Sequence, residues 1–474
     1  MLGAATVAGF APLEIFPLPF VTLALLFVLW RGASTPRYAA LIGFSWGLGF
    51  FLVGVSWVYV SLHDVGDMAL PLAAAATLLF CTCLALFPAA VAYAFKKLST
   101  NIPFIDASLL AGFWTAGEWL RGTGVAGFPW LSLGYSQVAS SPLSGFAPII
   151  GSYGVSFLLA LIAGLLACNW WRARALLLIV VLIGAGALLR MVPWTTASGD
   201  GLTVSLLQGN IPQSLKWDPR RLGLSLDTYR QLSNQHPAQL IVLPETAIPL
   251  LFDEIPPEYL RTLAGHNALL MGAALKTGND RYANAAVSLN FSGDNGIYAK
   301  SHLVPFGEYV PPGFAWFFNW VRIPMTNFES GQNQRPLMIQ GHKIAANICY
   351  EDVFGEEIIR QLPEADILIN LSNTAWFGRS LAQPQHLQMS RMRAIETGRP
   401  MLRSTNTGMT AAINPHGDVT SALLQFEQGA LTVDVTGYSG TTPYVLMGNY
   451  AVLIIIALSL LPAVAQRRRM RSKL

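Results

Sequence analysis

The chain has 474 residues, of which 53% are hydrophobic and only 12% are charged, and its mean hydropathy is +0.45. Soluble domains carry about 25% charged residues, so this composition argues against an ordinary soluble protein and predicts a membrane protein. The net charge is +4 at pH 7. The only dense basic cluster is the C-terminal QRRRMRSKL, which follows an apolar run and is typical of a cytoplasmic flank, so no nucleic-acid partner is expected.

Apolar runs occupy most of the first part of the chain. A helix that crosses a bilayer needs about 20 mainly apolar residues. We predict eight spans, at 1–11, 17–30, 38–60, 69–95, 105–120, 154–171, 175–189 and 450–465, of which the first is short for a crossing helix. The expected organisation is a membrane domain over residues 1–195 with about seven spans, and a final transmembrane helix over 445–466 that leads into a basic tail, 467–474.

Basic residues mark alternate connections between these runs: Arg31, Arg37, Lys96, Lys97, Arg172 and Arg174. Lysine and arginine are enriched in cytoplasmic loops, so both termini and the basic tail are expected in the cytoplasm. The long block between the last two spans is then expected outside the cytoplasm.

That block, residues 202–437, has the pattern of an α/β domain. Short runs rich in β-branched and aliphatic residues recur, such as LIVLPE, KIAANICYE and ADILINLSN, and polar, helix-compatible stretches separate several of them. Runs that are apolar on both faces indicate strands of a sheet covered on both sides.

Three of these expected strands end on residues with reactive side chains. LIVLPE ends on Glu245, GIYAKSHLVPFGEYVP carries Lys300 and Glu308, and ANICYE carries Cys349. Taken singly, each residue is more often a solvated or packing group. Together they supply a thiol nucleophile, a carboxylate that takes its proton and a cation that faces the developing oxyanion.

The order and spacing of LPE, K…HLVPFGEYVP and CYE resemble the nitrilase superfamily, which uses a Glu-Lys-Cys triad on an αββα sandwich. Longer strings, including QGNIPQSLKWD, KSHLVPFGEYVP and QHLQMSRMRAIETGRP, resemble the bacterial apolipoprotein N-acyltransferases, the membrane-embedded members of that superfamily. The resemblance implies a multi-span helical membrane domain joined to an extracytoplasmic nitrilase-like sandwich.

Roles follow from this resemblance, position by position. It implies that Glu245 is the general base, that Lys300 stabilises the oxyanion and that Cys349 is the nucleophile. Glu308 corresponds to a second glutamate that supports the intermediate. Three further positions correspond to residues that shape the site or its loops: Trp217, Tyr350 and Glu351.

The implied reaction moves an acyl chain from a phospholipid, through a thioester on Cys349, to the α-amino group of a lipoprotein's diacylglyceryl-modified N-terminal cysteine. It implies no metal or other cofactor, a monomer, and a place in the bacterial cytoplasmic membrane with the sandwich on the periplasmic side. The triad alone leaves a membrane-tethered carbon–nitrogen hydrolase open as an alternative.

Two apolar segments are candidates for handling lipid. GFPWLSLGYS carries Trp130 and Tyr135, which suit either an aromatic belt at the membrane interface or a rim where lipid gains access to the site. GFAWFFNW, residues 313–320, is a candidate lid.

Overall fold

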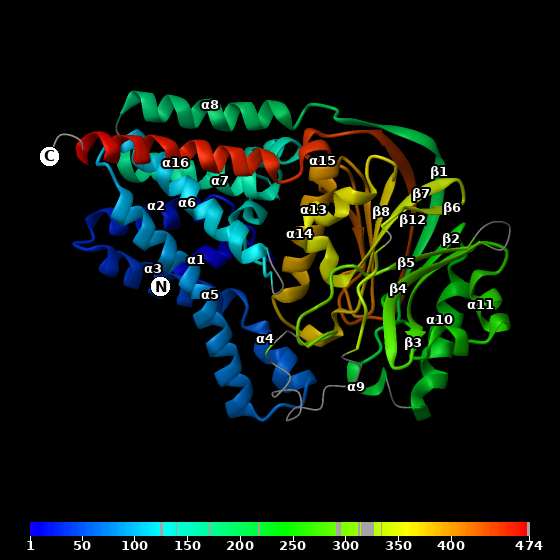
Figure 1. Cartoon of the computed structure of the whole chain (residues 1–474). Coiled ribbons are helices and arrows are strands. Elements are labelled where there is room, and N and C mark those ends of the chain that lie inside the picture. Colours follow the sequence, from blue (N-terminus) through cyan, green and yellow to red (C-terminus); the bar gives the residue numbers. More distant parts are fainter. Residues whose placement is uncertain are drawn as a thin grey trace. The chain divides into compact units, whose positions relative to one another are not determined.

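The computed structural model describes residues 1–123, 127–138, 140–169, 172–216, 219–290, 295–310, 313, 327–332 and 334–471. Its chain forms two compact units (Figure 1). The helical unit comprises Met1–Pro193, Arg379–Gln388 and Thr442–Leu474, and the α/β unit comprises Trp194–Gly378 and Met389–Thr441.

Long apolar helices make up the helical unit: α2 (Leu18–Gly32), α3 (Pro36–Gly54), α5 (Leu70–Leu98), α6 (Pro103–Gly122), α7 (Ala147–Asn169), α8 (Ala173–Leu189) and α16 (Tyr450–Arg471). Shorter turns of helix connect or precede them: α1 (Leu2–Thr6), η1 (Val7–Gly9), α4 (Trp57–Val60), η2 (Ser61–Val65), η3 (Leu133–Gln137), η4 (Pro142–Phe146) and α15 (Pro443–Met447). In Figure 1, α16 (red) runs beside α6 and α7, although about three hundred residues separate them in the sequence.

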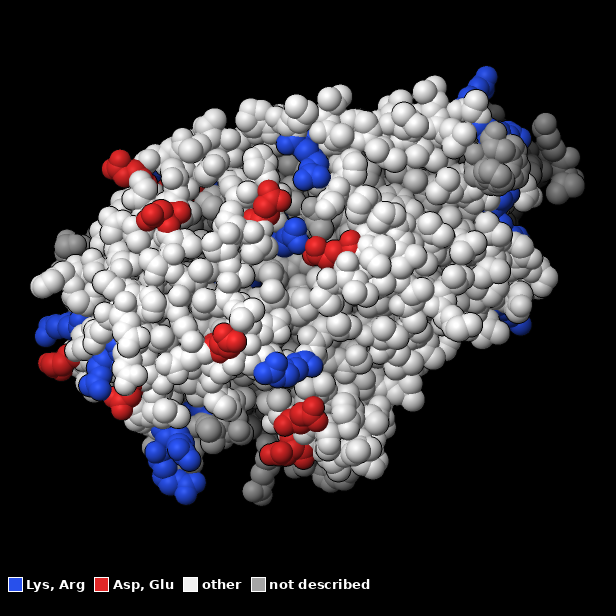
Figure 2. All heavy atoms as spheres, turned by 180° about the vertical axis from the view of Figure 1, so that it is seen from behind, with Lys and Arg blue, Asp and Glu red and all other residues white. Residues whose placement is uncertain are grey.

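Within the described residues, three helices are long and apolar enough to cross a membrane: Pro36–Gly54, Leu70–Leu98 and Pro142–Cys168. Shorter apolar helices cover Leu18–Gly32, Ala173–Leu189 and Tyr450–Ala463. Figure 2 shows wide areas of surface with no charged side chain, as the low charged fraction requires. The opening run forms only the five-residue helix α1 and one further turn, which is much shorter than the roughly 20 residues of a crossing helix.

Two glycines allow α3 and α5 to approach closely. A Cβ added at Gly43 would lie 2.5 Å from the carbonyl oxygen of Pro88, and one at Gly47 would lie 2.5 Å from the Pro88 ring. Small residues at helix interfaces let backbones approach and gain packing in a membrane. Gly43 and Gly47, the two ends of the sequence GFSWG, therefore belong to a helix-packing surface.

Two six-stranded sheets form the α/β unit. The first has the order β12-β1-β2-β3-β4-β5, with β12 (Gly429–Gly440), β1 (Thr195–Gln208), β2 (Leu240–Leu243), β3 (Ala268–Gly278), β4 (Arg281–Asn290) and β5 (Gly296–Ala299). The second has the order β11-β10-β9-β8-β7-β6, with β11 (Val419–Ala422), β10 (Ala411–Ile413), β9 (Met401–Thr405), β8 (Ile367–Ser372), β7 (His342–Ile348) and β6 (Leu337–Ile339).

Helices cover the outer faces of both sheets, and apolar side chains fill the space between them. On the first sheet lie α10 (Leu222–Gln235) and α11 (Pro257–Ala264), and near the second lie α13 (Gly355–Ile358) and α14 (Ala382–Thr397), whose N-terminal part belongs to the helical unit (Figure 1). The remaining turns are α9 (Gln213–Lys216), η5 (Pro219–Arg221), η6 (Phe252–Glu254), η7 (Cys349–Val353), η8 (Ile359–Gln361) and η9 (Thr374–Phe377). The inner core joins residues of both sheets, such as Val204 and Leu270 of the first and Ala346 and Ile369 of the second.

Strand direction brings the ends of three strands to one rim. β2 runs parallel to β1 and β3, and β5 has the same direction because two antiparallel pairings separate it from β3. In the second sheet, β7 pairs in parallel with β8. This αββα sandwich, together with the apolar helices, confirms the predicted fold class. Active sites of α/β proteins form beyond the carboxyl ends of parallel strands.

Candidate active site

Glu245 lies just past the carboxyl end of β2, and only 8% of it is exposed. Its Oε1 accepts a hydrogen bond from Asn284 Nδ2, and its Oε2 accepts one from the backbone N of Asn373, both at 2.8 Å. Each carboxylate oxygen is thus held by a fixed donor. The carboxylate is oriented rather than free to rotate, which a general base needs for a defined path to its proton.

Lys300 follows β5 and is almost completely buried, with 1% exposed. Its Nζ lies 2.8 Å from Glu308 Oε2 and 3.8 Å from Glu245 Oε1. Burial disfavours the charged amine, but the carboxylates of Glu308 and Glu245 outweigh burial and raise the pKa of Lys300 above its ordinary value. Lys300 is therefore a permanent cation at neutral pH.

Asn284 on β4 ties the two glutamates together. Its Nδ2 donates to Glu245 Oε1 and to Glu308 Oε1, both at 2.8 Å. Glu308 Oε2 also accepts from the backbone N of Val304 at 2.7 Å, which fixes the loop after Lys300. Two carboxylates and one lysine are thereby held in one hydrogen-bonded group.

Cys349 begins the turn η7 directly after β7, with φ +53. This left-handed backbone conformation is uncommon for a residue other than glycine and occurs often at functional sites. Burial, followed by the negative charge of Glu245, raises the pKa of the Cys349 thiol, while Lys300 acts in the opposite direction. The thiol is within hydrogen-bonding reach of Glu245, so Cys349 carries a neutral thiol next to a carboxylate.

Glu351 connects the nucleophile turn with the loop after Lys300. Its Oε2 accepts from the backbone N of Ile348 at 2.7 Å, and its Oε1 accepts from the backbone N of Ser301 at 2.6 Å and from Tyr298 at 3.0 Å. Burial raises the pKa of this carboxyl group. The contacts occupy Glu351 fully, which is the arrangement of a positioning group rather than of a second base.

Tyr350 extends away from this network toward other rings. Its ring centroid lies 5.9 Å from that of His302 and 5.1 Å from that of Phe354. His302 and Phe354 stack on each other, with centroids 3.8 Å apart. The residue after the nucleophile thus belongs to an aromatic cluster at the edge of the site.

A buried ion pair stabilises the turn η7 that carries Cys349. Arg403 on β9 donates from Nη1 to Asp352 Oδ2 at 2.6 Å, and both side chains are completely buried. Ser390 on α14 donates to the same Asp352 oxygen. Asn370 on β8 donates to the Cys349 carbonyl oxygen at 3.1 Å. These contacts hold the strained turn in place.

One glycine is needed for Glu245 to reach its position. A Cβ added at Gly272 on β3 would lie 2.5 Å from Glu245 Cα and 2.8 Å from the carbonyl oxygen of Pro244. We expect Gly272→Ala to push the Glu245 backbone away and to lower activity about 10²-fold, since a misplacement of about 1 Å costs that much in a preorganised site. The matched control is Gly278→Ala at the end of the same strand, where nothing lies within 4 Å of the added atom. Equal activities of the two variants in a turnover assay would contradict the prediction.

In the helical unit, Trp130 and Tyr135 are buried, with 1% and 2% exposed. The Trp130 ring packs on Trp57, with centroids 4.9 Å apart, and its Nε1 donates to Gln385 Oε1 at 2.7 Å. Both residues are therefore packed groups of this unit, and their part in lipid access stays a prediction.

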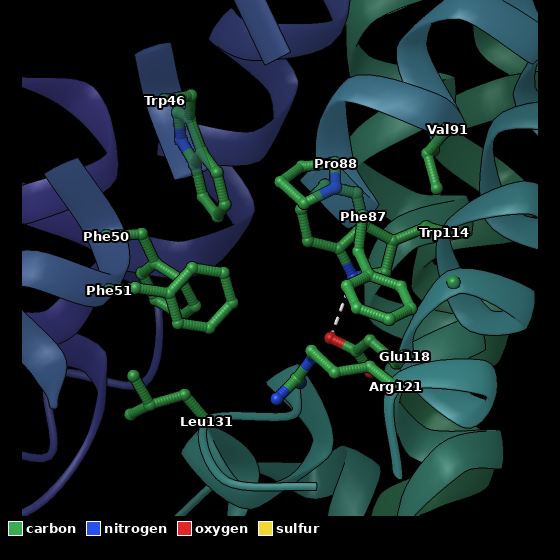
Figure 3. Close-up of a pocket in the computed structure, with 11 residues that line it drawn as sticks. Trp46, Phe50, Phe51, Phe87, Pro88, Val91, Trp114, Glu118, Arg121 and Leu131 are labelled. Atoms are coloured by element: carbon green, nitrogen blue, oxygen red, sulfur yellow. Dashed lines mark hydrogen bonds between the residues drawn. The ribbon is translucent and has the colours of Figure 1, made fainter. Parts of the chain in front are cut away.

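A pocket of about 320 Å³, open mouth included, lies between α3, α5 and α6 (Figure 3). Aromatic rings, among them Trp46 and Phe50, line one part, and Glu118 and Arg121 lie at another. Glu118 Oε1 accepts from Trp114 Nε1 at 2.9 Å, and Arg121 donates to the carbonyl oxygen of Trp130 at 2.5 Å. The two charged side chains of this segment therefore make contacts inside the unit.

Some predicted residues lie outside the described part of the chain: Trp217, residues 314–320 of the candidate lid, and the side chains of the basic tail at 467–474. Among the described residues, no group of three or more His, Cys, Asp or Glu side chains is arranged to hold a metal ion.

The structure adds site residues that the sequence interpretation missed: Lys216, Asn284, Asp352, Asn370, Asn373 and Arg403. The sequence does give a signal for three of them, Asn284, Asn370 and Arg403, because each is a polar residue inside an apolar strand run. A buried polar residue in a strand needs a partner, and here the partners belong to the candidate active site.

The comparison with known proteins first defines the class. Residues 203–444 match the carbon-nitrogen hydrolase family, and this range contains Glu245, Lys300 and Cys349. The α/β unit is thus a nitrilase-like domain.

Residues 2–165 match the apolipoprotein N-acyltransferase N-terminal domain. An apolipoprotein N-acyltransferase of Nitrosomonas europaea is 48% identical in an alignment that covers 97% of this chain and 95% of that protein. One of Ralstonia nicotianae is 42% identical in an alignment that covers 99% of this chain and 93% of that protein. The chain belongs to the apolipoprotein N-acyltransferase family, which confirms the predicted family.

Proposed function

We propose that this chain transfers an acyl chain from a phospholipid to Cys349, and from there to the α-amino group of a lipoprotein's diacylglyceryl-modified N-terminal cysteine. The observation that carries the proposal is the meeting of Glu245, Lys300 and Cys349 at one rim, with Glu308 bound to the lysine at 2.8 Å. This set supplies a base, a cation and a nucleophile within one hydrogen-bonded group.

In the first step, Glu245 takes the thiol proton as sulfur attacks the ester carbonyl of the phospholipid. The carbonyl oxygen becomes an oxyanion, and the Lys300 ammonium group stabilises it. The ester bond then breaks, Glu245 returns the proton to the leaving oxygen, and lysophospholipid departs. An acyl thioester remains on Cys349.

In the second step, the amine of the acceptor attacks the thioester carbonyl. A carbon–nitrogen bond forms, the carbon–sulfur bond breaks, and Glu245 carries one proton from nitrogen to the departing sulfur. Glu308 keeps Lys300 in place through both steps, while Tyr350 and Glu351 shape the turn that bears the nucleophile. These steps need no metal or other cofactor.

The setting of this reaction is proposed to be the bacterial cytoplasmic membrane. Helices of sufficient length and apolarity support membrane insertion, and the alternating basic flanks support a periplasmic position for the α/β unit. Residues 202–437 are then the catalytic domain, 1–195 and 445–466 anchor it, and 467–474 lie in the cytoplasm. Trp217, Trp130 and Tyr135 are proposed to help lipid reach the site, in a protein that works as a monomer.

The two-step order has a direct test. Purified protein given phospholipid without acceptor is expected to release about one equivalent of lysophospholipid per active site and to keep a stable thioester on Cys349. Mass spectrometry of the intact protein measures the acyl adduct. Release that waits for the acceptor would contradict the two-step order, and continuous release without acceptor would favour the carbon–nitrogen hydrolase alternative with water as acceptor.

A further inference from the structure

A second lysine lies beside the catalytic group and has no part in the steps above. Lys216 ends the short helix α9, and only 4% of it is exposed. Its Nζ donates to the backbone carbonyl oxygen of Glu245 at 3.3 Å. Lys216 therefore lies against the backbone of the residue that acts as general base.

The surroundings of Lys216 make its ammonium form less stable than it is in water. An ammonium group has three protons to donate, and the described residues provide one hydrogen bond and no carboxylate oxygen within 4 Å of Nζ. Burying a charge with so few partners is costly. Burial lowers the pKa of Lys216 to about 8, although the negative charge of Glu245 acts against this change, as a thiolate on Cys349 would.

Lys216 and Lys300 thus differ in their affinity for a proton, although both lie near Glu245 and Cys349. Lys300 has two carboxylates close to its Nζ, from Glu308 and Glu245, and stays charged. Lys216 approaches Glu245 and Cys349 from helix α9. Because its pKa is about 8, its amine gains and loses a proton near neutral pH. A group of this kind is suited to proton transfer, because a general base works best with a pKa near the working pH.

Proton balance in the second step calls for such a group. An α-amino group has a pKa of about 7.7–8.0, so the acceptor is mostly an ammonium ion at pH 7. The ammonium nitrogen carries three protons, and the amide product keeps one. Glu245 delivers one of the other two to the Cys349 sulfur, and the remaining proton needs a second acceptor.

We propose that the Lys216 amine takes the proton that the acceptor's ammonium group must lose before its nitrogen attacks the Cys349 thioester. The assignment rests on the two-step function proposed above and adds a residue to its second step. Lys216 becomes an ammonium ion, the acceptor becomes a neutral amine, and Lys216 later releases the proton to water. The first step needs no second proton acceptor, because its attacking group is the thiol, whose single proton Glu245 takes.

The test separates the two steps in the full-length protein in detergent. Thioester is first formed with phospholipid, excess lipid is removed, and a synthetic diacylglyceryl-cysteine peptide is then added while amide formation is followed. Lys216→Met is expected to form the thioester as the unaltered protein does, and to make amide about two- to tenfold more slowly at pH 7. About one acceptor in ten is neutral there, which sets the upper limit, and Lys216 is itself only partly neutral at this pH, which sets the lower one. The difference should disappear at pH 9, where the acceptor arrives as a neutral amine.

A second variant distinguishes proton transfer from charge. Lys216→Arg keeps the positive charge but has no proton-accepting form near neutral pH, so it is expected to match Lys216→Met. The exposed Lys276→Met is the control and should behave as the unaltered protein. Normal amide formation by Lys216→Arg at pH 7, a defect that persists at pH 9, or loss of the thioester itself in both Lys216 variants would overturn the assignment. Absence of a thioester on the unaltered protein would instead contradict the proposed function as a whole.

Discussion

Replacing Cys349 by alanine is expected to leave no acyl-enzyme and to reduce turnover to background, a loss on the order of 10⁶-fold as for other enzymes that lose their nucleophile. The reason is that sulfur forms the bond to the acyl group, and none of the groups that surround it can substitute for it in the same position. Glu245 and Lys300, which both interact electrostatically with the thiol, are proposed to act only on protons and charge. The measurement is the intact mass of the protein after incubation with phospholipid, together with amide formation on a lipopeptide.

Cys83→Ala is the matched control, because Cys83 is an exposed cysteine on α5 of the helical unit. It is expected to retain full acyl-enzyme formation. Cys349→Ser adds a sharper comparison: serine keeps the size of the side chain but has a much less acidic hydroxyl, so acylation should be strongly slowed. An acyl adduct on the Cys349→Ala protein would show that another residue is the nucleophile.

Replacing Glu245 by glutamine is expected to lower the rate of thioester formation by about 10²–10⁴-fold, the usual contribution of a general base. The amide has the same shape but cannot take the thiol proton. It also places an NH₂ group where Glu245 Oε1 now accepts from Asn284, or where Oε2 accepts from the backbone of Asn373, so one of these contacts is lost. Rapid-mixing measurements of thioester formation give the rate of this step directly.

The pH dependence of thioester formation tests whether Glu245→Gln is slow because it lacks the base. Glu245 raises the pKa of the Cys349 thiol, and Lys300 lowers it. Without the carboxylate, the thiol becomes more acidic, so the remaining activity of Glu245→Gln should increase with pH as thiolate forms unaided. Glu258→Gln, on the exposed side of α11, is the control and should leave the rate unchanged. Activity of Glu245→Gln near that of the unaltered protein would show that the base is another group.

The candidate residues Glu245, Lys300 and Cys349 could be selected from the sequence because each follows an apolar strand run within a short, recognisable string. Strand runs of LIVL and IAANI are apolar on both faces, and the structure buries all of β2 and most of β7. Such runs predict strands of a covered sheet, and the residues that follow them lie at its rim. The comparisons with relatives support the family, while the roles of individual residues remain predictions that the experiments above address.

The contacts of the supporting residues could not be predicted from the sequence in the same way. Asn284 contacts Glu245 and Glu308, which are 39 and 24 residues away in the sequence. Arg403 meets Asp352 across 51 residues. No local pattern marks these pairs, because strand order and register set which side chains meet, and neither is encoded by spacing along the chain.

Composition and local pattern were thus sufficient for the membrane class, the α/β domain and the residues at strand ends, since these depend on apolar runs and on short motifs that each lie within one segment. The conformation of Cys349 with φ +53, the close approach of Gly272 to Glu245, and the burial of Lys216 against the Glu245 backbone depend on segments that are distant in the chain. Burial and the charges that surround a group set its proton affinity, and both arise only when the two sheets and their connecting turns are packed together. For this reason Lys216 has the sequence context of an ordinary surface lysine, and only its packed surroundings make it a proton acceptor.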